Sequence, residues 1–168
     1  MATDVDAAHL AAAPAQGPFT ALTRRLLAAV MLLPIYAMTL YTLWMPAHEK
    51  FFESERVLGM YVRIFDGSIL DRLGLTVPMI YAIGVLELIT VALLVASLAR
   101  REFLPGRTAP LLLVGLWLAT VLYAMLGFGM RLVQNYPGLS SQYIYMIATL
   151  GFLAFTLIWK KRGTNPLT

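Results

Sequence analysis

Four long runs of hydrophobic residues dominate the sequence. They cover residues 26–45, 77–99, 109–130 and 142–159. Each run is close to the roughly 20 residues that a helix needs to cross the hydrocarbon core of a membrane. In lipid, a helix satisfies its own backbone hydrogen bonds, whereas an open strand does not. The pattern therefore predicts an all-α membrane protein, built as a four-transmembrane-helix bundle.

The segment between the first two runs, residues 46–76, mixes hydrophobic and charged positions. Its hydrophobic residues recur at helical spacing, at Val57, Tyr61, Ile64 and Phe65. We expect Pro46 to end the first helix, and the segment to form a short amphipathic helix at the outer membrane surface. Ser68 and Asp71 have the spacing of a capping box, and Gly74 can close a second short helix.

Prolines mark several helix boundaries. Pro78 and Pro110 fall in the first turn of the second and third runs, where the missing N–H costs nothing. Pro34 lies inside the first run, so we expect a kink there. The residues at 135–138, Asn-Tyr-Pro-Gly, predict a turn between the third and fourth runs.

Composition supports a membrane protein and excludes several other classes. The 168 residues are 60% hydrophobic and 13% charged, whereas soluble domains carry about 25% charged residues. The chain has no cysteine, which excludes disulfides, iron–sulfur clusters and cysteine-bound zinc. It has two histidines, His9 and His48, which argues against a haem held between two histidines within the bundle. The net charge of +4 does not indicate a nucleic-acid partner, because the basic residues sit at the ends of the hydrophobic runs.

The basic residues predict the orientation of the chain. With four spans, three basic clusters fall on the same side of the membrane: Arg24 and Arg25; Arg100, Arg101 and Arg107; Lys160, Lys161 and Arg162. The positive-inside rule then places both termini in the cytoplasm. We expect a flexible cytoplasmic tail at 1–19, the transmembrane domain at 20–162 and a C-terminal tail at 163–168, in a bacterial inner membrane.

The second run carries an acid, Glu87, near its middle. An ionisable side chain at this depth is costly, which makes it a candidate functional residue. The alternative is a neutral acid that hydrogen-bonds a neighbouring helix as structural glue. Gly84 lies one turn away and lets another helix or a ligand approach closely. Thr90, Val91 and Leu94 share the face of Glu87 at helical spacing.

Hydroxyl groups lie at a similar depth on the other three runs. They belong to Tyr36, Thr39, Thr120, Tyr123 and Thr149. These hydroxyls are the expected partners of the Glu87 carboxyl. Together with it they are candidates to hold a quinone head group or to pass a proton, and the alternative is plain packing.

Two further groups of polar residues follow hydrophobic runs. Shortly after the first run come three ionisable residues, His48, Glu49 and Lys50. We expect them to form a head-group site for a quinone or lipid, or to act as interfacial anchors. They are too few for a metal site, which takes three or four ligands. Arg131 follows the third run. We expect it to pair with Glu49 or Asp66, to bind a lipid phosphate, or to be a solvated helix end.

The second run resembles the signature helix of the DoxX-like membrane proteins. In "YAIGVLELITVALL", Gly84 and Glu87 occupy the glycine and glutamate positions of that helix. "EKFF" resembles the end of the first helix of the family and places Lys50 at its lysine. The four-span layout, with a long segment after the first span, also fits. The resemblance covers residues 22 to 162.

The resemblance implies a membrane subunit or partner of a redox system. Some relatives look like subunits of quinone-linked sulfur oxidation, and others like partners of redox-defence enzymes or assembly factors. Our first hypothesis is a non-catalytic subunit or assembly partner of a membrane complex, with a membrane protein or a second copy as partner. The alternatives are a quinone-reactive oxidoreductase subunit that uses Glu87, and a small proton-coupled transporter.

Overall fold

The computed structural model describes residues 18–104 and 107–163, and this part of the chain is helical with no strand. Most of the two predicted tails, 1–17 and 164–168, lies outside the described residues. The helices are α1 (Pro18–Phe52), α2 (Ser54–Phe65), α3 (Ile69–Arg72), α4 (Thr76–Ala99), α5 (Pro110–Leu132) and α6 (Tyr136–Gly163).

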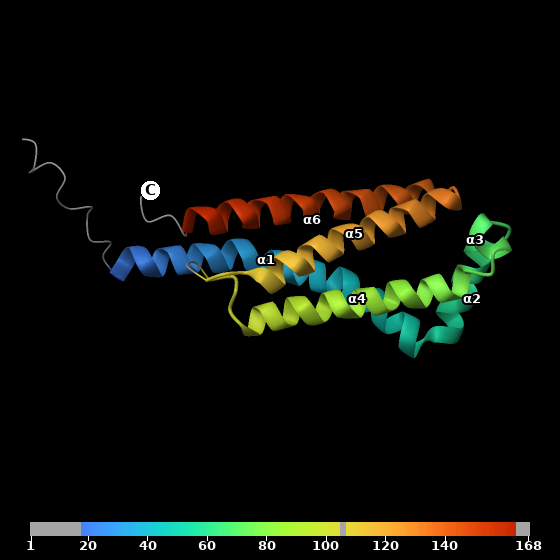
Figure 1. Ribbon diagram of the computed structural model, residues 1–168, viewed down its shortest axis with the longest axis horizontal. Coiled ribbons are helices and arrows are strands. Elements are labelled where there is room, and N and C mark those ends of the chain that lie inside the picture. Colours follow the sequence, from blue (N-terminus) through green and yellow to red (C-terminus); the bar gives the residue numbers. More distant parts are fainter. Residues whose placement is uncertain (1–17, 105–106, 164–168) are drawn as a thin grey trace, which may run out of the picture.

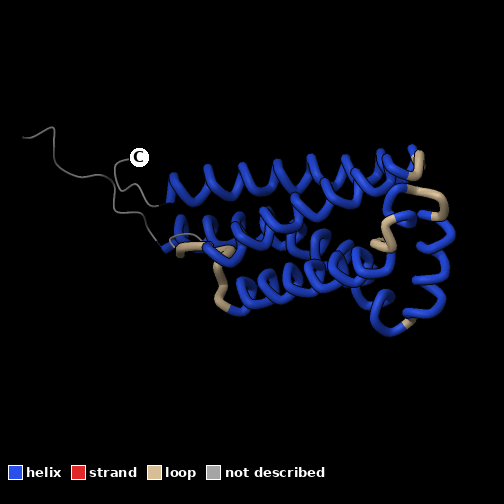
Figure 2. The backbone as a smooth tube through the Cα atoms, turned by 45° about the vertical axis from the view of Figure 1, so that its right-hand side comes forward, coloured by secondary structure: helices blue, strands red, loops and turns tan. Residues whose placement is uncertain are grey.

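The four long helices lie side by side along one axis (Figure 1). Helices α2 and α3 close one end of this bundle, and the backbone view from another side shows the same arrangement (Figure 2). At the opposite end, α1 begins, the α4–α5 connection turns back, and α6 ends (Figure 1). The bundle therefore has one end covered by short helices and one end built from loops and helix ends.

Four of the described helices are long and apolar enough to cross a membrane. The candidate spans are Val30–Phe52, Thr76–Ala99, Pro110–Leu132 and Tyr136–Lys160. This confirms the predicted four-span bundle and indicates a multi-pass membrane protein.

Helix α1 corrects the predicted end of the first span. It does not stop at Pro46 but continues to Phe52, with both Pro34 and Pro46 inside it. Proline removes one backbone hydrogen bond and strains the helix. Here packing on the rest of the bundle outweighs that loss, because Ala47 and Lys50 are buried one turn or less beyond Pro46.

Helix α6 corrects the predicted turn at 135–138. The helix begins at Tyr136, so Pro137 lies in its first turn instead of in a loop. The side-chain oxygen of Asn135 accepts a hydrogen bond from the Gly138 N–H at 3.1 Å and caps the new helix. The chain reverses just before, at Gln134, which has a φ of 55°.

The predicted short helices between the first two spans are both present, as α2 and α3. Val57 is the buried residue of α2. The Ser68 hydroxyl accepts a hydrogen bond from the Asp71 N–H at 3.3 Å, as the predicted capping box requires. Gly74 has a φ of +66°, in the left-handed region that glycine tolerates, and closes α3 as predicted.

The hydrophobic core lies between the long helices and forms two clusters. The first, at the loop end, includes Leu32, Ile35, Leu94, Leu112 and Leu116. The second, toward α2 and α3, includes Leu43, Ile83, Val91, Leu122 and Tyr123. Their residues come from α1, α4 and α5, so these three helices form the centre of the bundle.

The loop end is held by two charged residues: Glu102, for which the sequence pattern predicted no role, and Lys160, which served there only as a signal of orientation. Glu102 is 3% exposed, and its Oε2 accepts from the Leu112 N–H at 2.9 Å near the start of α5. The Lys160 ammonium donates to the backbone oxygens of Glu102, Leu104 and Arg107. These bonds fasten the end of α6 to the α4–α5 loop.

Candidate functional site

Glu87 is completely buried in α4 and pairs with Lys50 from α1. The Lys50 Nζ lies 2.7 Å from Oε1 and 2.6 Å from Oε2 of Glu87, so the ammonium bonds both carboxylate oxygens. Lys50 is itself only 2% exposed. Glu87 is therefore bonded by a lysine instead of by the expected hydroxyls, and Lys50 is buried instead of lying at the interface as expected. The two residues form one buried ion pair between helices.

The unbroken course of α1 explains why Lys50 faces inward. Leu43, Ala47 and Lys50 are spaced by four and three residues, which places them on one face of a helix, and all three are buried. A helix that ended at Pro46 would have released Lys50 to the surface. The extra turn of α1 thus creates the site.

Gly84 makes room for the lysine stem, which confirms the predicted close approach at this position. A Cβ added at Gly84 would lie 3.1 Å from the Phe51 ring and 3.2 Å from Lys50 Cδ. Both distances are tighter than ordinary van der Waals contact. The glycine therefore lets α1 lie against α4 at the depth where Lys50 reaches Glu87.

The two candidate tyrosines bond elsewhere. The Tyr36 hydroxyl lies 2.5 Å from Ser97 Oγ, and the Tyr123 hydroxyl lies 2.5 Å from Thr42 Oγ1. Each bond joins a pair of helices, α1 with α4 and α1 with α5. Sequence reasoning did not single out Ser97 or Thr42 as a partner, because the pairing depends on how each helix is rotated about its axis.

The candidate threonines also do not reach Glu87. Thr120 donates to the Leu116 carbonyl and Thr149 to the Tyr145 carbonyl, each within its own helix. Thr39 is buried with no hydrogen-bond partner among the described residues. The prediction of hydroxyl partners for Glu87 is therefore wrong, since Lys50 occupies both carboxylate oxygens.

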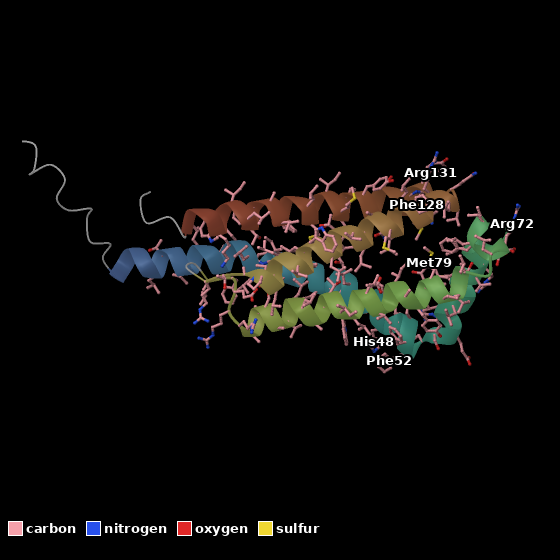
Figure 3. The ribbon with its side chains drawn as sticks, viewed as in Figure 1. His48, Phe52, Arg72, Met79, Phe128 and Arg131 are labelled. Carbon is pink, nitrogen blue, oxygen red and sulfur yellow. The ribbon has the colours of Figure 1, made fainter. Side chains whose placement is uncertain are left out.

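A pocket of about 40 Å³ lies beside the ion pair, where α2 and α3 meet α4 and α5. Lys50, Tyr61 and Thr76 contribute polar side chains to its lining. The remaining walls are mainly apolar and include Phe65, Met79, Ile83, Met125, Phe128 and Met130. Figure 3 shows Met79 on α4 and Phe128 on α5 at this end of the bundle.

Tyr61 comes from α2, outside the spans. Burial raises the pKa of the Tyr61 hydroxyl, and the negative charges of Glu87 and Glu49 raise it further. The phenol therefore keeps its proton well above neutral pH and remains a hydrogen-bond donor at the pocket.

Two predicted site residues lie apart from the pocket. The Arg131 guanidinium donates to the Tyr136 hydroxyl at 2.8 Å and lies over its ring at 5.3 Å, so its expected pairing with Glu49 or Asp66 is not formed. His48 stacks on Phe52 with 4.6 Å between ring centroids. Figure 3 shows both rings at the lower edge of the bundle, and Phe52 is 75% exposed.

Thr76 and Tyr61 are site residues that sequence reasoning missed, and Thr76 is the one whose buried hydroxyl has no hydrogen-bond partner among the described residues. Thr76 is 6% exposed. It opens α4 two residues before Pro78, and nothing in the hydrophobic pattern distinguishes it from a helix-start threonine. Within residues 18–104 and 107–163, no three His, Cys, Asp or Glu side chains gather as a metal site.

The pocket and the ion pair together offer hydrogen-bond donors inside an apolar surrounding, which suits a polar group on a lipid-soluble molecule. No family model, curated protein or solved structure matches the chain. The resemblance to DoxX-like proteins thus stays a prediction that rests on Gly84, Glu87 and Lys50.

Proposed function

We propose that this chain is a DoxX-like protein of the bacterial inner membrane and acts as a non-catalytic subunit or assembly partner of a membrane complex, with a redox complex as the expected class. Lys50 and Glu87, two of the residues that carry the resemblance, are the partners in the buried ion pair, which supports the family assignment. The proposal of a partner rests on one observation, the bare face of α6.

Helix α6 is buried far less than the other spans. In its most apolar window 11% of residues are buried, against 33% to 39% in the other three spans. Its open side is apolar, with exposed side chains at Ile144, Ile147, Leu150, Leu157 and Ile158. Gly151 and Ala154 are exposed between them, and no atom lies within 4 Å of a Cβ at Gly151. Small residues let a second transmembrane helix approach closely, so this face suits a membrane-protein partner.

The proposed orientation places both termini in the cytoplasm. Arg100, Arg101, Arg107 and Lys160 gather at the loop end of the bundle, where α1 begins and α6 ends. The positive-inside rule supports a cytoplasmic position for that end. Helices α2 and α3 then lie at the outer surface, with the pocket on the same side.

Substitution of Ala154 by tryptophan tests the partner proposal. We expect Ala154→Trp to reduce the amount of co-purifying membrane protein at least about tenfold, because a loss of about 1.4 kcal/mol of association energy has that effect. The measurement is native mass spectrometry after gentle extraction from the native membrane. The control is Val95→Trp, at a 50% exposed position on α4. Equal retention of a partner by both variants, or no partner with the unaltered chain, would refute the proposal.

A second candidate function is a quinone-reactive subunit of an oxidoreductase. The observation that favours it is the contact of Lys50 with both the pocket and Glu87. The apolar walls fit a quinone, Lys50 is the group to donate to its carbonyl, and Glu87 holds Lys50 in place. The pocket holds roughly three water molecules, which is less room than a substituted quinone ring needs, so the methionines of the lining must shift to admit it. Bound quinone would supply two-electron redox chemistry.

Replacing Glu87 with glutamine separates the two candidates. For a quinone-reactive subunit we expect quinone-dependent turnover of the purified complex to fall at least about tenfold, with the complex still assembled. For a non-catalytic partner, turnover per assembled complex is unchanged.

A proton-coupled transporter is the weaker alternative, because both oxygens of Glu87 already bond Lys50, whereas a transport carboxyl must bind and release a proton. Glu87-dependent proton flux in liposomes would support the transporter function.

A further inference from the structure

We propose that the pocket beside Lys50 binds an uncharged carbonyl group carried on a hydrocarbon chain, with Lys50 and Thr76 as the hydrogen-bond donors. The proposal goes beyond the role of a partner-binding subunit and does not depend on it, because it rests on the pocket alone. It deepens the quinone candidate by naming the group that the site recognises.

Lys50 has one donor to spare. An ammonium carries three N–H groups, and two of them point to Oε1 and Oε2 of Glu87. Within the described part of the chain no other acceptor bonds the Lys50 Nζ, and the side chain lines the pocket. A buried donor without an acceptor is costly, so an oxygen atom in the pocket is the expected partner.

Thr76 supplies a second unused polar group. Its side chain is more than nine-tenths buried and lines the same pocket, and its Oγ1 bonds no described residue. Buried hydroxyls in proteins nearly always have a partner. One N–H of Lys50 and the hydroxyl of Thr76, on different helices, therefore have no partner among the described residues at one small cavity, and a single ligand oxygen or two neighbouring ones can satisfy them.

The charges favour an uncharged ligand. Lys50 and Glu87 together carry no net charge, so a carboxylate or phosphate in the pocket would lack a counter-charge. Burying an unpaired charge costs much more than burying a hydrogen-bonded neutral group. Lys50, Tyr61 and Thr76 can all donate a hydrogen bond, which selects a ligand that accepts, such as an ester or ketone oxygen.

The size and lining of the pocket favour a small head on a long chain. About 40 Å³ holds roughly three water molecules, enough for a carbonyl and its neighbouring atoms. Phe128 lies at the rim and is 60% exposed, so a chain can leave the pocket past this ring toward the lipid. The pocket lining includes three methionines, Met79, Met125 and Met130, whose flexible side chains can adapt to different hydrocarbon chains of a ligand.

Binding of three probes with the same twelve-carbon chain, and of a quinone, to the detergent-solubilised full chain tests the proposal. The probes are methyl laurate, the laurate anion and dodecane, with a short-chain ubiquinone as a fourth. Native mass spectrometry counts the bound probe at increasing concentrations. We expect methyl laurate to bind at least about tenfold more tightly than dodecane or laurate, since a hydrogen bond to a charged donor is worth about that factor. Whether ester or quinone binds more tightly identifies lipid ester or quinone carbonyl as the source.

Two substitutions assign the donors. Thr76→Val keeps the shape and removes the hydroxyl, so we expect about fivefold weaker binding of methyl laurate. Its matched control is Thr90→Val, because Thr90 is buried on the same helix but already donates to the Leu86 carbonyl at 2.7 Å. The double variant Lys50→Met with Glu87→Met replaces the ion pair as a unit, and we expect at least about tenfold weaker binding.

Three results would overturn the proposal. The first is dodecane or laurate binding as tightly as the methyl ester. The second is equal affinity of Thr76→Val and Thr90→Val. The third is undiminished ester binding by a folded double variant. Each can be read from the same titrations, and folding is checked beforehand by the helix content of the purified variant.

Discussion

Replacing Lys50 with methionine is expected to lower the free energy of unfolding by about 3–5 kcal/mol. The substitution keeps a long side chain but leaves the Glu87 carboxylate buried in the bundle without its partner. Glu87 is 0% exposed, and in the structure both of its oxygens bond Lys50. An uncompensated buried charge is among the most destabilising changes that one substitution can make.

The double variant Lys50→Met with Glu87→Met is the matched control. Removing both charges as a unit is often neutral or stabilising, so we expect its unfolding free energy to lie within about 2 kcal/mol of the unaltered chain. The measurement is reversible unfolding in mixed micelles, followed by helix content, for Lys50→Met, Glu87→Met and the double variant. If the single and double variants lose the same stability, the ion pair does not link α1 to α4 in the way the structure shows.

Replacing Gly84 with leucine is expected to cost about 2–4 kcal/mol, because it overpacks the α1–α4 contact and displaces Lys50 from Glu87. A Cβ at this position is already 3.1 Å from the Phe51 ring and 3.2 Å from Lys50 Cδ. The further atoms of leucine have no space unless α1 moves away. We expect the loss of the ion pair to follow from the loss of close approach.

Gly151→Leu on α6 is the control for this effect. It makes the same chemical change within a transmembrane helix, but no atom lies within 4 Å of a Cβ there. We expect a change within about 0.5 kcal/mol in the isolated chain. Unfolding in mixed micelles measures both variants side by side. Equal destabilisation by the two substitutions would mean that Gly84 is needed for a reason other than the space it leaves for the Lys50 side chain.

The ion pair has a further consequence for the pocket. Lys50 forms part of the pocket wall, and its position depends on Glu87 and on the space above Gly84. Helix α2 adds Tyr61, from outside the four spans. A change in any of these residues is therefore expected to alter both the stability of the α1–α4 contact and the donors that a ligand meets.

Sequence patterns predicted the elements that depend on local chemistry. The four spans follow from run length, and α4 was predicted within one residue of its observed start at Thr76. The cap of α3 at Ser68 follows from residue types at fixed spacing. The buried face of α4, with Gly84 and Glu87, follows from the helical repeat. In each case, neighbours along the chain supply the decisive interactions.

The predictions that failed concern interactions between distant segments. Pro46 ends a helix by its own chemistry, yet α1 continues because its next turn is buried against α4. The partner of Glu87 was sought among hydroxyls at equal depth, but the Lys50 side chain is long enough to reach it from the end of α1. Pairing of Arg131 with Glu49 or Asp66 was one of three alternatives, and the exposed arginine instead bonds Tyr136, five residues away.

The sequence by itself determined that this is a helical membrane protein, where its spans lie, and that Glu87 is a buried polar group of the bundle. The tertiary structure decided which group satisfies Glu87, which tyrosines and threonines bond each other, and that a small pocket with unused donors lies beside Lys50. Run length and helical repeat are properties of the chain, whereas the rotation of each helix about its axis is set by packing against its neighbours. Only that rotation determines which side chains meet.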